Sequence, residues 1–313
     1  MVKDNVIILL GPTAAGKTDL AMAIADNYPV DIISVDSAMI YKGLDIGTSK
    51  PDRSVLKVYP HKLIDIKRPD ETYSVGKFCE DASYEIQQSL ARGRVPLLVG
   101  GTMMYFNSLL NGLHDLPEAN QQIRDEIEAM VQDKGLKYVH EILSQVDPIA
   151  SARIHPNDPQ RIQRALEVFY SSGEPISAHY IKTKDSVLSS YNVLPLVVNP
   201  DDRKDLHKRI ATRFHKMLSL GFVEEVQSLY ENKDKFADLP AIRAVGYSQV
   251  WQYLGGTYSY DELINRGIIA TRQLAKRQIT WLRKLAKNFT PIADTYSKSL
   301  HNLVYQHISS QCT

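Results

Sequence analysis

The sequence predicts an α/β protein in which a parallel β-sheet carries helices on both faces and an all-helical domain is inserted in the chain. Short apolar runs at residues 5–10, 31–35 and 95–99 are typical of strands that are buried on both faces. Amphipathic stretches at 17–28 and 78–91 separate these runs. Because strands that alternate with helices favour parallel pairing, we expect one sheet between two layers of helices.

The pattern changes to one helix after another between residues 116 and 190. The helices expected here are separated by Pro and Gly and cover 120–133, 136–146 and 159–171. We interpret residues 116–190 as a helical insertion domain and assign residues 1–115 and 191–313 to the α/β core. After the insertion, residues 193–198 form a further candidate strand, and Pro195 either argues against this strand or places it at the edge of the sheet.

The average charge argues against a surface that binds nucleic acid throughout. The 313 residues contain 37 Lys and Arg against 36 Asp and Glu, a net charge of +1.

No early apolar run reaches the roughly 20 residues that cross a bilayer or the core of about 7 to 15 in a signal peptide. We therefore expect a cytoplasmic protein without a membrane anchor, and we expect a monomer. The two cysteines, Cys79 and Cys312, lack the spacing of a zinc site.

The average conceals two segments of opposite charge. Residues 115–147 hold eight Asp and Glu against three Lys and Arg, a net charge of −5. Residues 263–293 hold seven Lys and Arg and no acidic residue, a net charge of +7. At about 100° per residue, a helix over this segment would present its cations around Arg272 and pack its apolar side chains, Trp281 among them, on the opposite face.

This uncompensated basic face favours a polyanion partner, because like charges repel along a helix. Two further basic clusters occur, at residues 203–216 and at Arg153, Arg161 and Arg164. Three clusters indicate a local RNA or DNA surface whose phosphate contacts position the nucleic acid.

A phosphate-binding motif directly follows the first expected strand. It matches G-x-x-x-x-G-K-[ST], in which a glycine-rich turn points backbone N–H groups at phosphate and opens a helix. Its members are Gly11, Pro12, Thr13, Ala14, Ala15, Gly16, Lys17 and Thr18. Lys17 would contact the terminal phosphates, and the Thr18 hydroxyl would ligate Mg²⁺. The motif indicates a core like that of the P-loop-containing nucleoside triphosphate hydrolases. It leaves nucleotide hydrolysis, phosphoryl transfer and release of a diphosphate leaving group open.

Two more polar residues follow expected strands. Asp36 comes after residues 31–35, and Thr102 follows the Gly-Gly pair that ends the strand at 95–99. Because open α/β sheets bind ligands at the carboxyl ends of their strands, both side chains should lie at the same edge as Lys17. Asp36 is a candidate for indirect Mg²⁺ binding or for a general base.

With these motifs the chain resembles the bacterial tRNA dimethylallyltransferases, also called tRNA isopentenyltransferases, over nearly its whole length. The matching segments are GPTAAGKT (11–18), DSAMIYKGLDIGTSKP (36–51), YSVGKFCEDA (73–82), PLLVGGTMMY (96–105), HPNDPQRIQRALEV (155–168), RAVGYSQ (243–249) and TRQLAKRQITWLR (271–283). The first segment is common to phosphate-binding loops, and the others are specific in this order and spacing.

The resemblance implies transfer of a dimethylallyl group from dimethylallyl diphosphate to N6 of the adenosine immediately 3′ of the anticodon. Asp36 would accept the N6 proton, and Thr102 would lie beside the bridging oxygen or the target base. Lys17, Mg²⁺ on Thr18, and Arg213 would stabilise the charge that grows on the diphosphate.

The resemblance also implies that the inserted domain closes over the anticodon stem-loop of a tRNA. The residues that it assigns to tRNA contact are Asp36, Ser37, Ala38, Met39, Thr102, Arg124, Gln160, Arg161, Ile162, Gln163, Arg164, Arg243, Ala244, Val245, Gly246, Tyr247, Ser248, Lys276, Arg277, Gln278, Ile279, Thr280, Trp281, Leu282 and Arg283. One departure affects a tRNA backbone contact, since Ser248 stands where relatives often carry Arg.

Three alternatives stay open at this point. An adenylate isopentenyltransferase would share the phosphate loop but act on a free nucleotide, which requires neither the long insertion nor the basic clusters. A small-molecule P-loop kinase would leave the basic helix without a role. A non-catalytic RNA-binding protein would leave the phosphate loop without one. Prenylation of tRNA is therefore the leading hypothesis.

Overall fold

The computed structural model describes residues 3–180, 185–198, 200, 202–237, 239–287 and 289–310, so that Cys312 lies outside the described residues. The chain divides into two compact units. One comprises Met1–Leu110 and Val187–Thr313, and the other comprises Asn111–Ser186. The sequence-based division placed the insertion a few residues later, at 116–190.

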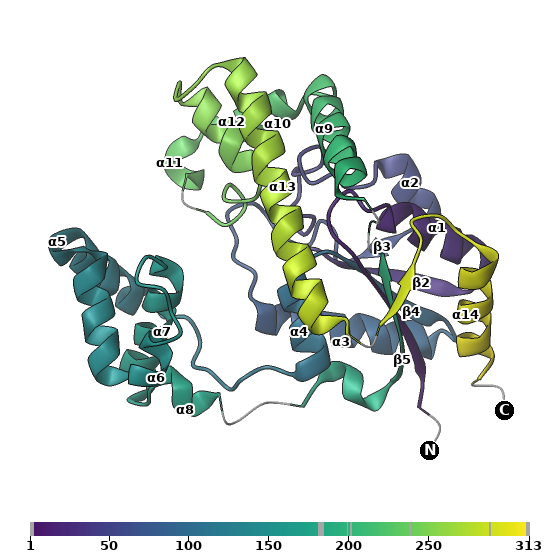
Figure 1. The fold of residues 1–313 in the computed structure, drawn as a ribbon, viewed down its shortest axis with the longest axis horizontal. Coiled ribbons are helices and arrows are strands. Elements are labelled where there is room, and N and C mark those ends of the chain that lie inside the picture. Colours follow the sequence, from purple (N-terminus) through teal and green to yellow (C-terminus); the bar gives the residue numbers. More distant parts are fainter. Residues whose placement is uncertain are drawn as a thin grey trace. The chain divides into compact units, whose positions relative to one another are not determined.

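A six-stranded sheet forms the centre of the larger unit, in the order β3-β2-β4-β1-β5-β6 with every neighbouring pair parallel (Figure 1). Its strands are β1 (Asn5–Leu10), β2 (Val30–Val35), β3 (His61–Lys62), β4 (Val95–Gly100), β5 (Asn192–Val198) and β6 (Thr290–Ile292). The predicted α/β class and its three buried strands are confirmed, while β3 and β6 were not expected.

The edge position expected for the strand with Pro195 is wrong. β5 pairs with β1 along nearly its whole length and with β6 from Leu196 to Val198. Pro195 therefore lies just before the β5–β6 ladder begins. A residue without an N–H group is tolerated inside the sheet because the short β6 has no partner opposite this position.

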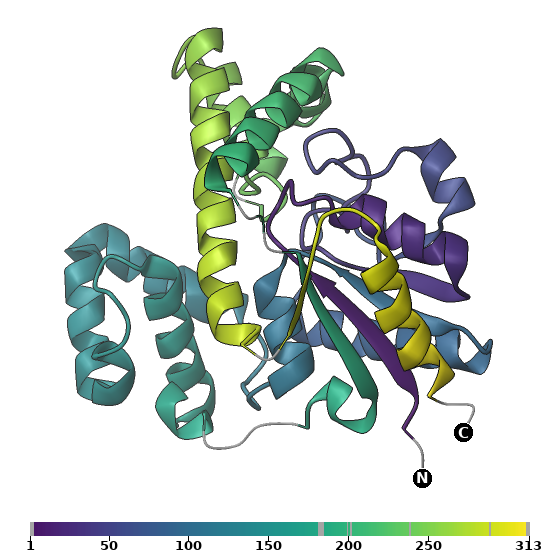
Figure 2. The same ribbon diagram turned by 45° about the vertical axis from the view of Figure 1, so that its right-hand side comes forward.

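Helices cover both faces of the sheet. On one face, α1 (Lys17–Asn27) and α14 (Lys298–Ser309) bury apolar side chains such as Leu20 and Val304 against alternate residues of the strands. The remaining strand side chains point to the opposite face, where α3 (Val75–Ala91) packs on β2 and β4 (Figure 2). α4 (Met103–Asn111) follows β4, and α2 (Arg53–Val58) precedes β3.

The C-terminal half adds a second apolar core around the loop that follows β2. Its helices are α9 (Arg203–Ser219), α10 (Phe222–Tyr230), α11 (Lys233–Phe236), α12 (Tyr247–Leu254) and α13 (Tyr260–Leu285). Phe214, Phe222 and Tyr247 are buried there with Tyr41 and Leu44 of the loop. The loop is thus part of the packing between these helices and does not lie free on the surface.

The smaller unit is all-helical, with α5 (Gln121–Val146), α6 (Pro148–Ser151), α7 (Pro159–Ser172) and α8 (Ile176–His179). Gly135 has φ 82° and interrupts α5, at the join expected between two helices. The short helix η1 (Val187–Ser190) opens the return to the larger unit. Within the described part of the chain, no helix is long and apolar enough to span a membrane.

Candidate active site

The phosphate loop connects β1 to the first residue of α1. Left-handed backbone at Ala14 (φ 62°) and Gly16 (φ 83°) turns the loop back before the helix begins at Lys17. A Cβ on Gly11 would lie 2.9 Å from the Val198 carbonyl oxygen, so that a side chain is excluded there. Lys17 Nζ donates a hydrogen bond to the Pro12 carbonyl at 2.8 Å. The loop is therefore a tight turn directly before a helix N-terminus, a geometry that suits an anion.

Lys17, Arg213 and Asp36, three of the four predicted catalytic residues, interact electrostatically. Burial, then repulsion from Arg213, lowers the pKa of Lys17 to about 8, against the opposing effect of Asp36. Burial likewise lowers the pKa of Arg213, again opposed by Asp36. Two half-buried cations thus share the neighbourhood of a single carboxylate, and a bound diphosphate would relieve their repulsion.

Asp36 has a fixed orientation at the end of β2. Its Oδ1 accepts hydrogen bonds from the backbone N–H of Ala38 at 2.8 Å and of Met39 at 3.2 Å. Its Oδ2 accepts none from the described residues and stays available to a substrate. Thr102 Oγ1 supports the same turn, since it accepts from the Ser37 N–H at 3.0 Å and donates to Ser37 Oγ at 3.3 Å. Asp36 and Thr102 therefore meet at one edge of the sheet, as predicted from the strand ends.

Gln278 of α13 joins the phosphate loop to the turn after β4. Its Oε1 accepts from the Thr13 N–H at 2.8 Å, and its Nε2 donates to the Gly101 carbonyl at 2.9 Å. A Cβ on Gly101 would lie 2.7 Å from Gln278 Nε2, so a side chain there would displace the amide that forms these two hydrogen bonds. The amide of this residue, assigned to tRNA from the sequence, has both of its groups bound inside the protein.

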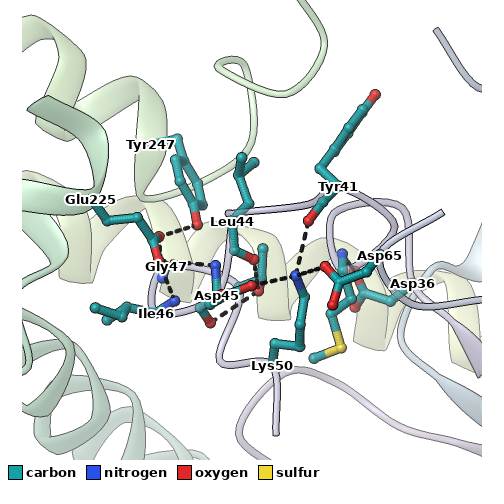
Figure 3. A network of polar contacts seen from close by, with 12 residues as sticks. Asp36, Tyr41, Leu44, Asp45, Ile46, Gly47, Lys50, Asp65, Glu225 and Tyr247 are labelled. Carbon is teal, nitrogen blue, oxygen red and sulfur yellow. Dashed lines mark hydrogen bonds and ion pairs between the residues drawn. The ribbon is translucent and has the colours of Figure 1, made fainter. Parts of the chain in front are cut away.

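The loop after β2 carries the partners of Arg213. Arg213 Nε donates to Ser49 Oγ at 2.6 Å, and its terminal nitrogen lies 3.4 Å from the Thr48 carbonyl. Figure 3 shows how the preceding loop residues are bound to Glu225 and Tyr247 on one side and to Lys50 on the other. The sequence analysis did not single out Glu225 or Lys50. The only feature of the sequence that could have pointed to either residue is that Lys50 lies within the family-matching segment 36–51.

The tRNA-assigned residues of the smaller unit separate into two groups. Gln160 and Arg161 are exposed near the start of α7. Arg124 and Arg164 bind the buried Glu167 carboxylate at 2.8 and 2.7 Å, and Gln163 donates to the Arg124 carbonyl. Burial raises the pKa of Glu167, but the hydrogen bonds from Arg124 and Arg164 outweigh it and hold that pKa below its usual value. Ile162 is fully buried and has no surface to offer an RNA.

The basic helix is α13, and its exposed face is the expected one except at Arg272 and Trp281. Trp281 is 41% exposed, whereas the sequence analysis placed it on the packed face, which is wrong. Ala275 and Leu282 are buried, and Arg272 Nε is buried without a partner among the described residues. Arg272, which was taken as the centre of the exposed face, therefore lies at its half-buried margin. Among the residues assigned to tRNA on this helix, Lys276, Arg277, Thr280, Trp281 and Arg283 are exposed, while Gln278 and Ile279 are half-buried.

The segment 243–248 enters α12. Arg243 is exposed, Ala244, Val245 and Ser248 are half-buried, and Gly246 and Tyr247 are buried. Tyr247 donates its hydroxyl to Glu225. Ser37 is exposed beside Asp36, with Ala38 and Met39 half-buried after it.

The sequence profile of the family described as IPP transferase matches residues 39–285. The chain belongs to the IPP transferase family. A second profile, described as isopentenyl transferase, matches residues 4–69. The family expected from the motifs is therefore confirmed.

Solved structures similar to this chain include two bacterial proteins of this kind. A tRNA isopentenylpyrophosphate transferase from Bacillus halodurans is 33% identical, with 99% of this chain and 98% of that chain covered and a TM-score of 0.71. A tRNA delta(2)-isopentenylpyrophosphate transferase from Staphylococcus epidermidis is 29% identical, with 99% and 100% covered and a TM-score of 0.68. A eukaryotic dimethylallyltransferase acting on tRNA is 25% identical, with 98% and 78% covered and a TM-score of 0.78.

An IPP transferase is consistent with a divalent metal, and the residues of this site fit one. The described residues include no group of three or more His, Cys, Asp or Glu side chains suited to a metal. Mg²⁺ requires no such group, because it usually takes one or two protein ligands and completes its shell with phosphate oxygens and water. The half-buried Thr18 hydroxyl makes no hydrogen bond to another described residue and is free to be that ligand.

Proposed function

We propose that the protein transfers a dimethylallyl group from dimethylallyl diphosphate to N6 of the adenosine immediately 3′ of the anticodon in tRNA, with release of diphosphate. The chain belongs to the IPP transferase family, and one structural observation supports this proposal most directly. A phosphate loop, the half-buried cations Lys17 and Arg213 and a carboxylate with a free oxygen meet at one edge of the sheet.

The phosphate loop, together with Lys17 and Arg213, binds the diphosphate and stabilises it as it leaves. Backbone N–H groups of the phosphate loop at the start of α1 cradle the diphosphate, and Lys17 contacts its terminal oxygens. When the allylic C–O bond breaks, both bonding electrons leave with the diphosphate and its negative charge grows. Lys17 and Arg213 stabilise this charge from fixed positions, which lowers the barrier more than mobile cations would. Mg²⁺ on Thr18 would supply additional neutralisation of the leaving group.

The acceptor half of the reaction depends on Asp36. The adenine N6 attacks the allylic carbon, a C–N bond forms, and the amine must lose a proton. The free Oδ2 of Asp36 accepts that proton, while the bonds of Oδ1 to Ala38 and Met39 keep the carboxylate in place. Thr102 holds the turn that carries Asp36. Because N6 cannot be reached while the base is stacked, the adenosine leaves the anticodon-loop stack to react.

We propose that the exposed face of α13 and the exposed residues of the smaller unit bind the tRNA. Lys276, Arg277 and Arg283 are exposed cations suited to phosphates, and the exposed Trp281 is suited to stacking on a base. Gln160 and Arg161 offer a second contact on the helical domain. Ile162, Tyr247 and Leu282 are buried, so we assign them to the scaffold beneath this surface. We further propose a cytoplasmic, monomeric enzyme.

The test measures where a labelled dimethylallyl group goes. Purified protein with Mg²⁺ and labelled dimethylallyl diphosphate is given unmodified tRNA, AMP or neither. We expect label on tRNA, none on AMP, and no hydrolysis of ATP in a parallel reaction. Label on AMP but not on tRNA would support the adenylate isopentenyltransferase instead. That alternative is not favoured, because the IPP transferase profile covers 39–285 and the isopentenyl transferase profile only 4–69.

A further inference from the structure

The Glu225 carboxylate of α10 binds four donors of the active-site region. Its Oε2 accepts from the backbone N–H groups of Asp45 at 2.9 Å and Ile46 at 2.7 Å. Its Oε1 accepts from the Gly47 N–H at 3.1 Å and from the Tyr247 hydroxyl (Figure 3). Burial and the neighbouring carboxylate raise the pKa of Tyr247, so that it stays a hydrogen-bond donor. One carboxylate thus fixes three consecutive backbone groups of the loop.

Close packing fixes the same loop segment against α10 and α12. A Cβ on Gly47 would lie 2.1 Å from the Phe222 ring and 2.5 Å from the Tyr247 ring, so that only glycine fits. The Phe222 and Tyr247 rings pack edge to face at 5.1 Å. The backbone at Gly47 therefore has no room to move relative to the two helices.

Lys50 fixes the loop at its other end. Its buried Nζ donates to the Tyr41 carbonyl at 2.9 Å and to the carboxylates of Asp45 at 2.5 Å and Asp65 at 2.6 Å. All three ammonium protons therefore have acceptors. The loop from Asp45 to Lys50 is bound at both ends by charged groups that touch neither Lys17 nor Asp36 in the described structure.

Only two residues lie between these anchors, and they bind Arg213. Thr48 and Ser49 accept hydrogen bonds from its guanidinium, and Ser49 holds the unfavourable φ of 53°. Such backbone persists only where its surroundings impose it, and Glu225 and Lys50 supply that constraint. Since the half-buried Arg213 lies close enough to Lys17 to lower the pKa of Lys17, their repulsion pushes the guanidinium away unless something holds it.

We propose that Glu225 and Tyr247 are positioning residues for the diphosphate, acting through the loop 45–49 on the Arg213 guanidinium. This inference rests on the proposed function, in which Arg213 stabilises the leaving diphosphate. It also gives Tyr247, which the resemblance assigned to tRNA contact with residues 243–248, a role in binding the diphosphate. Glu225 is 12 residues from Arg213 in sequence yet reaches it through a loop about 175 positions earlier in the chain.

The test compares Glu225→Gln and Tyr247→Phe with the matched control Glu224→Gln. Glu224 is exposed on the same helix and accepts no hydrogen bond from the loop among the described residues. Gln at 225 would turn an amide N–H toward two of the four donors, whereas Phe at 247 removes one hydroxyl and keeps the packed ring. Two quantities are measured in the full-length protein, the Kd of inorganic pyrophosphate with Mg²⁺ and the kcat and KM of tRNA prenylation.

For Glu225→Gln we expect a pyrophosphate Kd higher and a kcat lower by roughly 10- to 100-fold, the scale of a misplaced catalytic group. The KM for tRNA should stay within a few-fold. Tyr247→Phe should change Kd and kcat in the same direction by less, and Glu224→Gln should match the wild type. In an Arg213→Ala background, neither variant should add more than about twofold, because the residue through which they act is gone.

Two results would overturn the inference. One is a wild-type pyrophosphate Kd and kcat in Glu225→Gln while Arg213→Ala changes both. The other is a full effect of either variant in the Arg213→Ala background. If Glu225→Gln does not fold, the same comparison of pyrophosphate Kd and kcat in Tyr247→Phe, with and without Arg213→Ala, tests the inference. If the wild type transfers nothing to tRNA, the proposed function has failed, and pyrophosphate binding still decides the positioning role.

Discussion

At Asp36, the two carboxylate oxygens have different tasks. Oδ1 is bound by the N–H groups of Ala38 and Met39, and Oδ2 is free of described partners. Asp36→Ala should lower kcat by roughly two to four orders of magnitude, the usual effect of losing a general base. The Kd for tRNA should stay within a few-fold. Single-turnover kinetics and filter binding measure the two quantities.

The variant Asp36→Asn separates the role of Asp36 as a general base from its role in holding the turn at residues 36–39. Asn keeps an oxygen for the two N–H groups and loses the proton acceptor, so it should lose as much activity as Ala with less effect on stability. A large loss of tRNA affinity with normal turnover in either variant would make Asp36 a binding residue.

Lys17 makes the binding of diphosphate depend on pH. Burial and Arg213 lower its pKa to about 8, so that it becomes neutral as the pH rises through that value. A bound diphosphate favours the protonated form and raises this pKa. The affinity for inorganic pyrophosphate should therefore be greatest below pH 8 and fall above it by up to about tenfold per pH unit.

Lys17→Met should bind pyrophosphate more weakly and lose this dependence. Calorimetry on both sides of pH 8 makes the comparison, with buffers of different ionisation enthalpy to count the protons taken up. A wild-type affinity that stays constant through pH 8 would contradict the role of Lys17. Pyrophosphate affinity should fall above pH 8, but the stability of the free protein should rise. Because the pKa of Lys17 is lower in the folded than in the unfolded chain, the free energy of unfolding should increase as the pH goes from about 8 toward 10.5.

Among the helices, α13 has two separate tasks on two faces. Gln278 ties the phosphate loop to Gly101, while Lys276, Arg277 and Arg283 are exposed. Neutralising these three cations together should reduce the slope of log Kd against log salt for tRNA, because each phosphate contact contributes to it. Binding of pyrophosphate should be unchanged. A tRNA slope equal to that of the wild type would make this face an ordinary solvated one.

α7 offers a matched pair of arginines. Arg164 and Arg124 neutralise the buried Glu167, whereas Arg161 is exposed with a longer 3.4 Å pair to Asp158. Arg164→Ala should lower the free energy of unfolding by roughly 1 to 3 kcal/mol, because a buried carboxylate loses a partner. Arg161→Ala should leave stability near the wild type and weaken tRNA binding. Urea unfolding of the full chain shows the difference, and equal stability losses would refute it.

The same elements show how far the sequence could predict structure. Long apolar runs and the break at Gly135 identified β1, β2, β4 and the two parts of α5 correctly. β6 was missed because three residues around Pro291 carry no periodic signal. Trp281 was placed on the wrong face because burial of the Arg272 stem was not foreseeable from residue types alone.

For the whole molecule, motifs predicted which polar residues gather at one edge of the sheet better than which residues hold them there. Lys17, Thr18, Asp36 and Thr102 follow strand ends, and parallel topology brings strand ends to one edge. Glu225 has no such signal, since its partners Asp45 to Gly47 lie far away in sequence. Long-range hydrogen bonds to backbone groups leave no trace in a single sequence.

The overall charge of +1 likewise conceals two segments of opposite charge in the chain. Residues 115–147 carry −5 and residues 263–293 carry +7, so one segment repels phosphate and another attracts it. The basic segment forms α13, which also reaches the phosphate loop through Gln278. The helix whose exposed cations we propose to bind RNA is thus the same helix that hydrogen-bonds the phosphate loop.

Site-specific prenylation of tRNA tests the central claim most directly. Two unmodified tRNA transcripts are compared that differ only in the nucleotide immediately 3′ of the anticodon, adenosine in one and guanosine in the other. Each is incubated with protein, Mg²⁺ and dimethylallyl diphosphate, digested to nucleosides and analysed by mass spectrometry. We predict N6-dimethylallyladenosine and an equal amount of diphosphate from the first transcript, and neither from the second. Equal modification of both transcripts, or of neither, would contradict the account.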